Sequence, residues 1–354
     1  MNMTCNRKTG KAAVLLAMAA ASLSACSDWT DPESLGINFQ GQDKTRYEAH
    51  LAEVRAYKEG DHKIMVIKMD NKALPGSRAD HLSSVPDSVD YVVLNTYDNL
   101  SAEVAAEIGE AKDRKGIKTL LPIDFQQIEA AYEQEAASEE TALQEEGEEE
   151  PTEETDPFID FCNRQMDAAM EACTHYGYAG IDVVYNGTFP FSLPSEEQEV
   201  LKKRQEFFIG KIETWTDANP EAVLLFEGKP QNLFGNTGWL EKADYVIVNV
   251  EAASTMEEQL IAVDMAKVEG VPESRLLLGV SAIVAGSKEG EGFLDVEDGN
   301  GGLLTSLQGA VQVLSRKEAG YLRGICVNHA QYDYYYADRV YKNIRAALYA
   351  ISHL

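Results

Sequence analysis

The chain has 354 residues, of which 44% are hydrophobic and 25% are charged, a balance that lets most of it bury a core and excludes disorder of the whole. Its 31 Lys and Arg residues face 59 Asp and Glu residues, which gives a formal net charge of −28. A surface this negative repels phosphate backbones, so nucleic acid is excluded as an expected partner.

The first 26 residues follow the pattern of an export signal. Basic residues precede an apolar run at 12–23, and Leu23-Ser24-Ala25-Cys26 closes it. The run is shorter than the roughly 20 residues that span a bilayer, and its order of charge, apolar core and small residues predicts a signal peptide over residues 1–25. The closing residues resemble the lipobox of bacterial lipoproteins, in which the Cys is acylated. The acidic residues that follow resemble the surface-export signal of Bacteroidetes lipoproteins.

These resemblances imply lipidation at Cys26, a lipidated linker over residues 26–44 and an outer-membrane, surface-exposed location. A plain signal peptide with a chance Cys is the alternative. The other cysteines argue against a disulfide framework, because an odd number remains after the leader: Cys162, Cys173 and Cys326. We expect these three to be buried free thiols. The chain has no CxxC, no HExxH and no His pair at ligand spacing, so we predict neither a metal nor a cofactor.

From His62 onward, short apolar runs alternate with amphipathic segments. Near-continuous apolar runs rich in β-branched residues are typical of parallel strands that are covered on both faces. The predicted strands are residues 64–69, 91–94, 119–123, 180–185, 223–226, 245–250, 276–280 and 322–327.

The segments around these strands carry helix signals. A capping Ser opens a predicted helix over residues 101–115, and a Ser-x-x-Glu capping box opens another over 254–270. Residues 196–215 and 337–353 have the apolar spacing of helices. Eight strand–helix units predict an α/β fold, a (β/α)8 barrel over residues 45–354. A doubly wound open sheet is the alternative, but no Gly-rich phosphate turn follows the first strand.

One segment interrupts the alternation. Twelve of the 24 residues from Glu133 to Asp156 are acidic, none is basic and few are apolar. Such a run buries too little apolar surface to offset its ordering entropy. We expect residues 133–156 to be a disordered acidic insertion in the third connection between strand and helix.

The fourth predicted strand carries a motif. It reads Ala179-Gly-Ile-Asp182-Val-Val184-Tyr-Asn186 and resembles DGxDxDxE, the signature of glycoside hydrolase family 18, the chitinases and endo-β-N-acetylglucosaminidases. The likeness extends from about His62 to the C-terminus. It implies a barrel with its active site at the carboxyl ends of the strands.

The departures from the signature bear on catalysis. Asn186 replaces the Glu that protonates the leaving oxygen, Val184 replaces the Asp that steers the substrate's acetamido group, and Ala179 replaces the first Asp. Loss of the acid alone removes a factor of about 10²–10⁴ in rate. The motif is therefore degenerate, and we interpret Asp182 as a buried structural carboxylate.

A ring of polar and aromatic residues follows the predicted strands. Amides and carboxylates bind pairs of hydroxyls, and aromatic faces cover the apolar side of a sugar. By position the ring comprises Asp70, Asn71, Asn95, Tyr97, Asp124, Tyr185, Asn186, Glu227, Lys229, Asn249, Glu251, Asn328, His329, Gln331 and Tyr332.

Three functions remain open at this point. The leading hypothesis is a surface glycan-binding lipoprotein, catalytically inactive, that holds N-acetylglucosamine-containing glycans such as N-glycans for an outer-membrane importer. The rival is an active glycoside hydrolase that uses relocated carboxylates, Glu227 and Glu251, after adjacent strands. A purely structural envelope protein is the third class.

Overall fold

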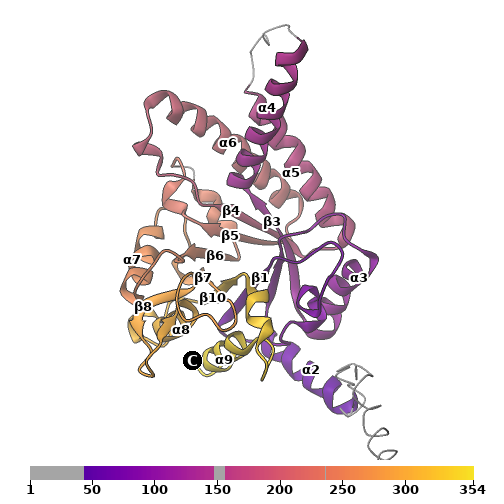
Figure 1. Ribbon diagram of the computed structural model, residues 1–354, viewed down its shortest axis with the longest axis vertical. Helices are drawn as coiled ribbons and strands as arrows, with labels where there is room; N and C mark the ends of the chain where they lie inside the picture. The colour runs from indigo at the N-terminus through magenta and orange to yellow at the C-terminus, as the bar shows by residue number, and fades with distance from the viewer. Residues whose placement is uncertain (1–43, 147–155, 236) are drawn as a thin grey trace, which may run out of the picture. The chain divides into compact units, whose positions relative to one another are not determined.

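The computed structural model describes residues 44–146, 156–235 and 237–354 (Figure 1), with side chains described up to residue 138 and again from residue 156. The predicted signal peptide, Cys26 and the linker up to residue 43 lie outside these residues. The chain divides into a unit that ends at His50 and a unit Leu51–Leu354, and the second unit holds the barrel.

Eight parallel strands close into a barrel in the order β1-β10-β7-β6-β5-β4-β3-β2 (Figure 1). The predicted (β/α)8 barrel is therefore confirmed, and the strand positions agree with the prediction to within a few residues. The strands are β1 (Ile64–Met69), β2 (Tyr91–Leu94), β3 (Lys118–Asp124), β4 (Gly180–Tyr185), β5 (Val223–Gly228), β6 (Tyr245–Asn249), β7 (Leu276–Ser281) and β10 (Gly324–Asn328).

Helices surround this barrel. They are α3 (Ala102–Glu110), α4 (Phe125–Glu146), α5 (Pro157–Tyr176), α6 (Ser195–Ala218), α7 (Met256–Ala266), α8 (Ser306–Leu314) and α9 (Lys342–Ile351). A further helix, α2 (Lys44–Glu59), precedes β1 in the chain and spans the boundary between the two units. The β1–β2 connection and the described part of the β5–β6 connection contain only short 3₁₀ turns. In the described residues, these two connections therefore carry no α-helix, in contrast to a regular barrel in which a helix follows every strand.

The helix boundaries follow from capping. Ser101 caps α3 as predicted, and a π turn carries the helix on to Lys115. The capping box predicted at residues 254–257 is wrong by one residue, because the Thr255 hydroxyl accepts the Glu258 N–H at 3.2 Å. That helix stops at Ala266. The predicted closing helix 337–353 begins only at Lys342, because Tyr341 has left-handed backbone geometry with φ 52°.

A small hairpin was not predicted. β8 (Phe293–Glu297) and β9 (Leu303–Thr305) pair antiparallel in the connection between β7 and α8. The segment around them is rich in Gly and acidic residues, which hides a strand pattern.

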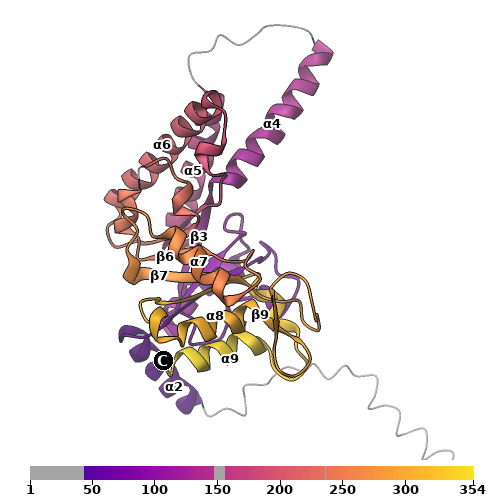
Figure 2. The same cartoon turned by 90° about the vertical axis from the view of Figure 1, so that its left-hand side faces the viewer.

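The acidic insertion lies in the third connection, as predicted, and α4 reaches into it (Figure 2). Its first part, residues 133–146, is helical and not irregular. Ala, Glu and Gln are strong helix formers, so they extend a helix whose first turns already pack on the barrel. Residues 147–155 lie outside the described part.

Two apolar clusters hold the barrel. The inner cluster lies inside the barrel and includes Val66, Leu225 and Cys326. The outer cluster lies between strands and helices and includes Cys162 and Cys173. All three cysteines are free and buried, as predicted. Within the described residues, no helix is long and apolar enough to cross a membrane.

Candidate functional site at the barrel mouth

The motif strand β4 sends alternate side chains to opposite faces. Ile181, Val183 and Tyr185 belong to the outer cluster, so Asp182 and Val184 point into the barrel. Gly180 is required at the start because a Cβ there would lie 2.0 Å from the Val223 carbonyl oxygen. The glycine of the motif thus lets β4 and β5 approach.

A buried ion triad lies under the mouth. The Lys68 ammonium contacts Asp182 at 2.9 Å and also binds Glu227, and none of the three residues is more than 8% exposed. Burial alone would lower the pKa of Lys68, but Asp182 and Glu227 hold it well above its usual value. The second oxygen of Asp182 has no hydrogen-bond partner. Asp182 is therefore buried, as predicted, but it serves a charged cluster.

A polar network leads from this triad to the surface. The Asn328 amide donates to Glu227 at 3.3 Å and to Glu251 at 2.9 Å. Asn249 donates to Glu251 at 3.2 Å, and the Ser281 hydroxyl also donates to it. Burial raises the pKa of Glu227, against the opposing effect of the Lys68 charge. Glu227 and Glu251, the two carboxylates of the hydrolase hypothesis, therefore share one amide donor, Asn328.

The rim of the mouth is a second polar group. Asp70 accepts from Asn95 at 2.7 Å and pairs with His329 at 2.6 Å, and Gln331 binds its side chain and backbone. The Tyr332 ring stacks on His329 with centroids 5.5 Å apart and planes 18° apart. Tyr332 is 37% exposed, so part of this side chain is accessible to a ligand.

The rim pair should make stability depend on pH. Hydrogen bonds, led by His329, lower the pKa of Asp70 to about 2, and Asp70 raises the pKa of His329. The stabilisation is therefore present between about pH 4 and 6.5, and is lost as pH rises through the raised His329 pKa or falls toward 2. Both side chains are more than a third exposed, so screening limits the effect to about 1 kcal/mol at most.

We expect Asp70→Asn to lower the melting temperature by on the order of 2 °C near pH 6, and by less at pH 8.5. Thermal unfolding from pH 4 to 9 measures this. The control is Asp338→Asn, because the Asp338 carboxylate pairs with Lys342 and not with a His. The melting temperature of this variant should differ from that of the wild type by a constant amount above pH 6. Parallel curves for the two variants would contradict the assignment.

Other predicted ring residues lie at the mouth in supporting positions. Asp124 accepts the Gln127 N–H at 3.0 Å at the start of α4, and burial raises its pKa. The Asn186 backbone N–H donates to Gln126 at 2.7 Å. Lys229 is exposed.

Three predicted ring residues, and Ala179 of the degenerate motif, pack away from the ring. Tyr185 is 1% exposed and packs in the outer cluster, 5.4 Å from the Phe125 ring, because its position on β4 faces away from the barrel. Tyr97 also packs against the outer cluster. Asn71 binds the Thr96 backbone through both amide atoms. Ala179 packs against the inner cluster.

Sequence reasoning missed two members of the network. Lys68 stood out as the one charge in an apolar strand, but its partners lie 114 and 159 residues away. Ser281 carried no signal. Within the described ranges, no group of three or more His, Cys, Asp or Glu side chains could hold a metal ion.

A closed parallel barrel with carboxylates, amides and a stacked aromatic at the carboxyl ends of its strands defines the class of (β/α)8 barrel proteins, whose functional sites lie at that end. The model of glycoside hydrolase family 18, BT1044-like, matches residues 30–350, and the chain belongs to this family. A search of curated proteins finds no match.

Solved structures agree on the fold. A BT1044 structure is 17% identical, with a TM-score of 0.58, and the match covers 86% of this chain and 92% of that one. Catalytic domain 2 of the Ostrinia furnacalis Group II chitinase is 9% identical with a TM-score of 0.52, covering 83% and 96%. At these identities the likeness concerns the fold alone.

Proposed function

We propose that the protein binds a glycan at the barrel mouth without cutting it. The observation that carries this proposal is Asn186, which stands where the family-18 signature has its proton-donating Glu. An amide cannot act as a general acid at the leaving oxygen. Val184 stands where the signature has the steering Asp, and it can hold no charge against a developing cation.

The remaining carboxylates under the mouth support this proposal. Asp182 and Glu227 both bind the Lys68 ammonium, so each commits a carboxylate oxygen to a buried cation. The barrel centre therefore suits a structural ion cluster better than acid catalysis.

The proposed ligand is a glycan that contains N-acetylglucosamine, such as an N-glycan. Membership in family 18 suggests this class, and a structural neighbour is by name a chitinase. The mouth offers matching groups: Asn95, Asn249 and Asp70 can pair with hydroxyls, and Tyr332 can cover the apolar face of a sugar ring.

Truncating the mouth should weaken this binding. We expect Tyr332→Ala to cost about 1 kcal/mol because a stacking face is lost, and Asn328→Ala about 1–3 kcal/mol because buried partners lose their donor. Titration with a glycan selected on an array measures both. The control is Tyr349→Ala, an exposed ring on α9, which should bind as wild type does. Unchanged affinity in the two mouth variants would remove the mouth as the binding site.

A hydrolase with relocated carboxylates is the second candidate. Two observations favour it. Asn328 binds both Glu227 and Glu251, and burial raises the pKa of Glu227, as a carboxyl group that donates a proton requires. A release assay on a high-mannose glycoprotein decides between the two. Sustained turnover that Glu227→Gln or Glu251→Gln abolishes would replace the binding-only proposal.

We also propose a lipid anchor at Cys26, an outer-membrane surface location and delivery of the glycan to a neighbouring importer. The motivation is the lipobox-like Leu23-Ser24-Ala25-Cys26. We expect Cys26→Ala to move the protein from the membrane fraction to the soluble fraction, since acyl chains supply the anchoring energy. Cys162→Ala is the control and should stay with the membrane. A Cys26→Ala protein that still sediments with membranes would contradict lipidation there.

A further inference from the structure

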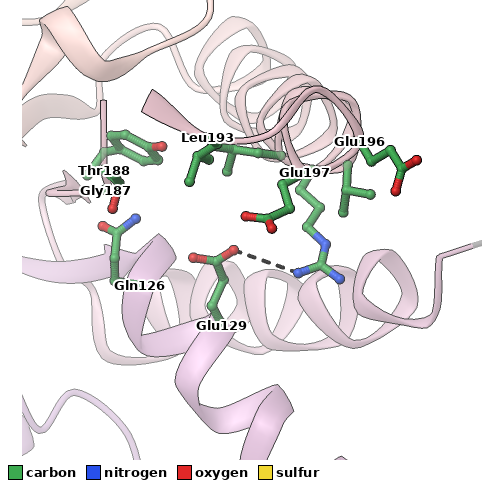
Figure 3. Close-up of a pocket in the computed structure, with 11 residues that line it drawn as sticks. Gln126, Glu129, Gly187, Thr188, Leu193, Glu196 and Glu197 are labelled. Atoms are coloured by element: carbon green, nitrogen blue, oxygen red, sulfur yellow. Dashed lines mark ion pairs between the residues drawn. The ribbon is translucent and has the colours of Figure 1, made fainter. Parts of the chain in front are cut away.

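A second pocket opens on the outer side of β4. It has a volume of about 410 Å³ and lies between the start of α4, the loop after β4 and the first half of α6 (Figure 3). This volume falls in the usual range of small-molecule sites. The pocket adjoins the mouth, because Gln126 in its wall accepts the Asn186 backbone N–H.

The floor of the pocket presents donors that lack acceptors. The Gln126 amide nitrogen is buried without a partner. The Tyr185 hydroxyl accepts a hydrogen bond from Gln205, but no described residue accepts its own proton. Both groups converge beside Gly187: a Cβ there would lie 2.5 Å from the Tyr185 oxygen and 2.9 Å from the Gln126 nitrogen. Buried donors without acceptors are costly, so they indicate a ligand that supplies acceptors.

The walls select the charge of that ligand. Figure 3 shows the Glu129 and Glu197 carboxylates pointing toward one another across the pocket. Among the described lining residues, Arg204 is the one cation; it is bound by Asp156 at 2.7 Å and lies 3.8 Å from Glu129. The excess of carboxylates repels an anion. A simple cation has no acceptors for the floor, so the groups present fit a neutral ligand with both acceptors and donors.

Two exposed aromatic rings lie in the loop that lines one side of this pocket. Phe189 and Phe191 follow the lining residues of the β4–α6 loop, both are exposed, and their rings lie 5.5 Å apart. Phe191 also packs edge-on against Phe234, 5.8 Å away. Exposed rings beside a polar pocket are suited to the apolar face of a sugar.

We infer that this pocket is a second carbohydrate subsite, which takes a neutral sugar through its hydroxyl or acetamido oxygens. The inference rests on the proposed function for its ligand class. The Gln126 and Tyr185 donors bind the acceptors of the sugar, and the Glu129 and Glu197 carboxylates accept from its hydroxyls. Two adjoining sites would let the protein hold two parts of one branched glycan.

Hydrogen exchange of the full chain locates binding at each site separately. We use N,N′-diacetylchitobiose as the probe, and N-acetylneuraminic acid as its anionic counterpart. We expect the neutral sugar to slow exchange in residues 187–200 at least about threefold, and the anionic sugar not to do so. Protection at residues 328–336 reports the mouth.

Two variants test the pocket. Val200→Trp fills it from an exposed lining position, with Ile261→Trp on α7 as the matched control; circular dichroism checks that both fold. Tyr185→Phe removes one donor from the floor of the pocket. It should raise about tenfold the sugar concentration that gives half-maximal protection. We expect Val200→Trp to abolish protection of residues 187–200 and Ile261→Trp to keep it.

The outcomes separate the two proposals. Protection at the mouth alone overturns the second subsite and leaves the proposed function standing. Protection at the pocket alone supports the subsite and overturns the mouth as the binding site, and protection at neither site overturns both. Pocket protection that survives Val200→Trp and Tyr185→Phe also overturns the subsite.

Discussion

Replacing Lys68 with Met should destabilise the protein by about 3–5 kcal/mol, because it removes the cation from two buried carboxylates. Asp182 is fully buried and Glu227 almost so, and Lys68 is the ammonium that both contact. Without it, one carboxylate must take up a proton or the barrel must admit water. Urea unfolding at pH 7 measures the loss as a lower midpoint at unchanged slope.

Two matched variants make the result specific. Lys242→Met removes an exposed cation that pairs with the exposed Asp217, and it should leave the urea midpoint nearly unchanged, because solvent screens an exposed pair. The triple variant Lys68→Met, Asp182→Asn, Glu227→Gln removes all three charges, and it should recover most of the stability. Equal losses for Lys68→Met and Lys242→Met would contradict a buried charged triad.

Restoring the family signature should create hydrolysis only when two residues change together. We expect Val184→Asp with Asn186→Glu to raise cleavage of an aryl N,N′-diacetylchitobioside at least about 10²-fold above the wild-type background, since it supplies both the acid and the steering carboxylate. Asn186→Glu alone should remain near background, because the acetamido group stays unsteered.

The double variant should also cost stability. Val184 is buried and pairs in register with Asp124, so a new carboxylate enters a region that already holds Asp182 and Glu227. Asn186→Gln, an amide of similar size to Glu, is the control and should show no activity. Cleavage by the wild type equal to that of the double variant would contradict an inactive barrel.

The sequence by itself determined the barrel. Strands such as Ile64–Met69 and Gly180–Tyr185 are apolar at nearly every position, because both of their faces are buried. That signal is local, so it was readable residue by residue. The motif on β4, its missing acid and the polar residues after the strands were readable for the same reason.

Only the tertiary structure decided which side chains meet. Lys68 finds its partners 114 and 159 residues along the chain, a pairing that closure of the barrel creates and no local pattern carries. The structure also decided which face of β4 each residue takes. The position of Tyr185 at the end of a strand predicts a ring residue. Successive side chains of a strand point to opposite faces, however, so Tyr185 packs in the outer cluster, and its hydroxyl lies on the floor of a different pocket.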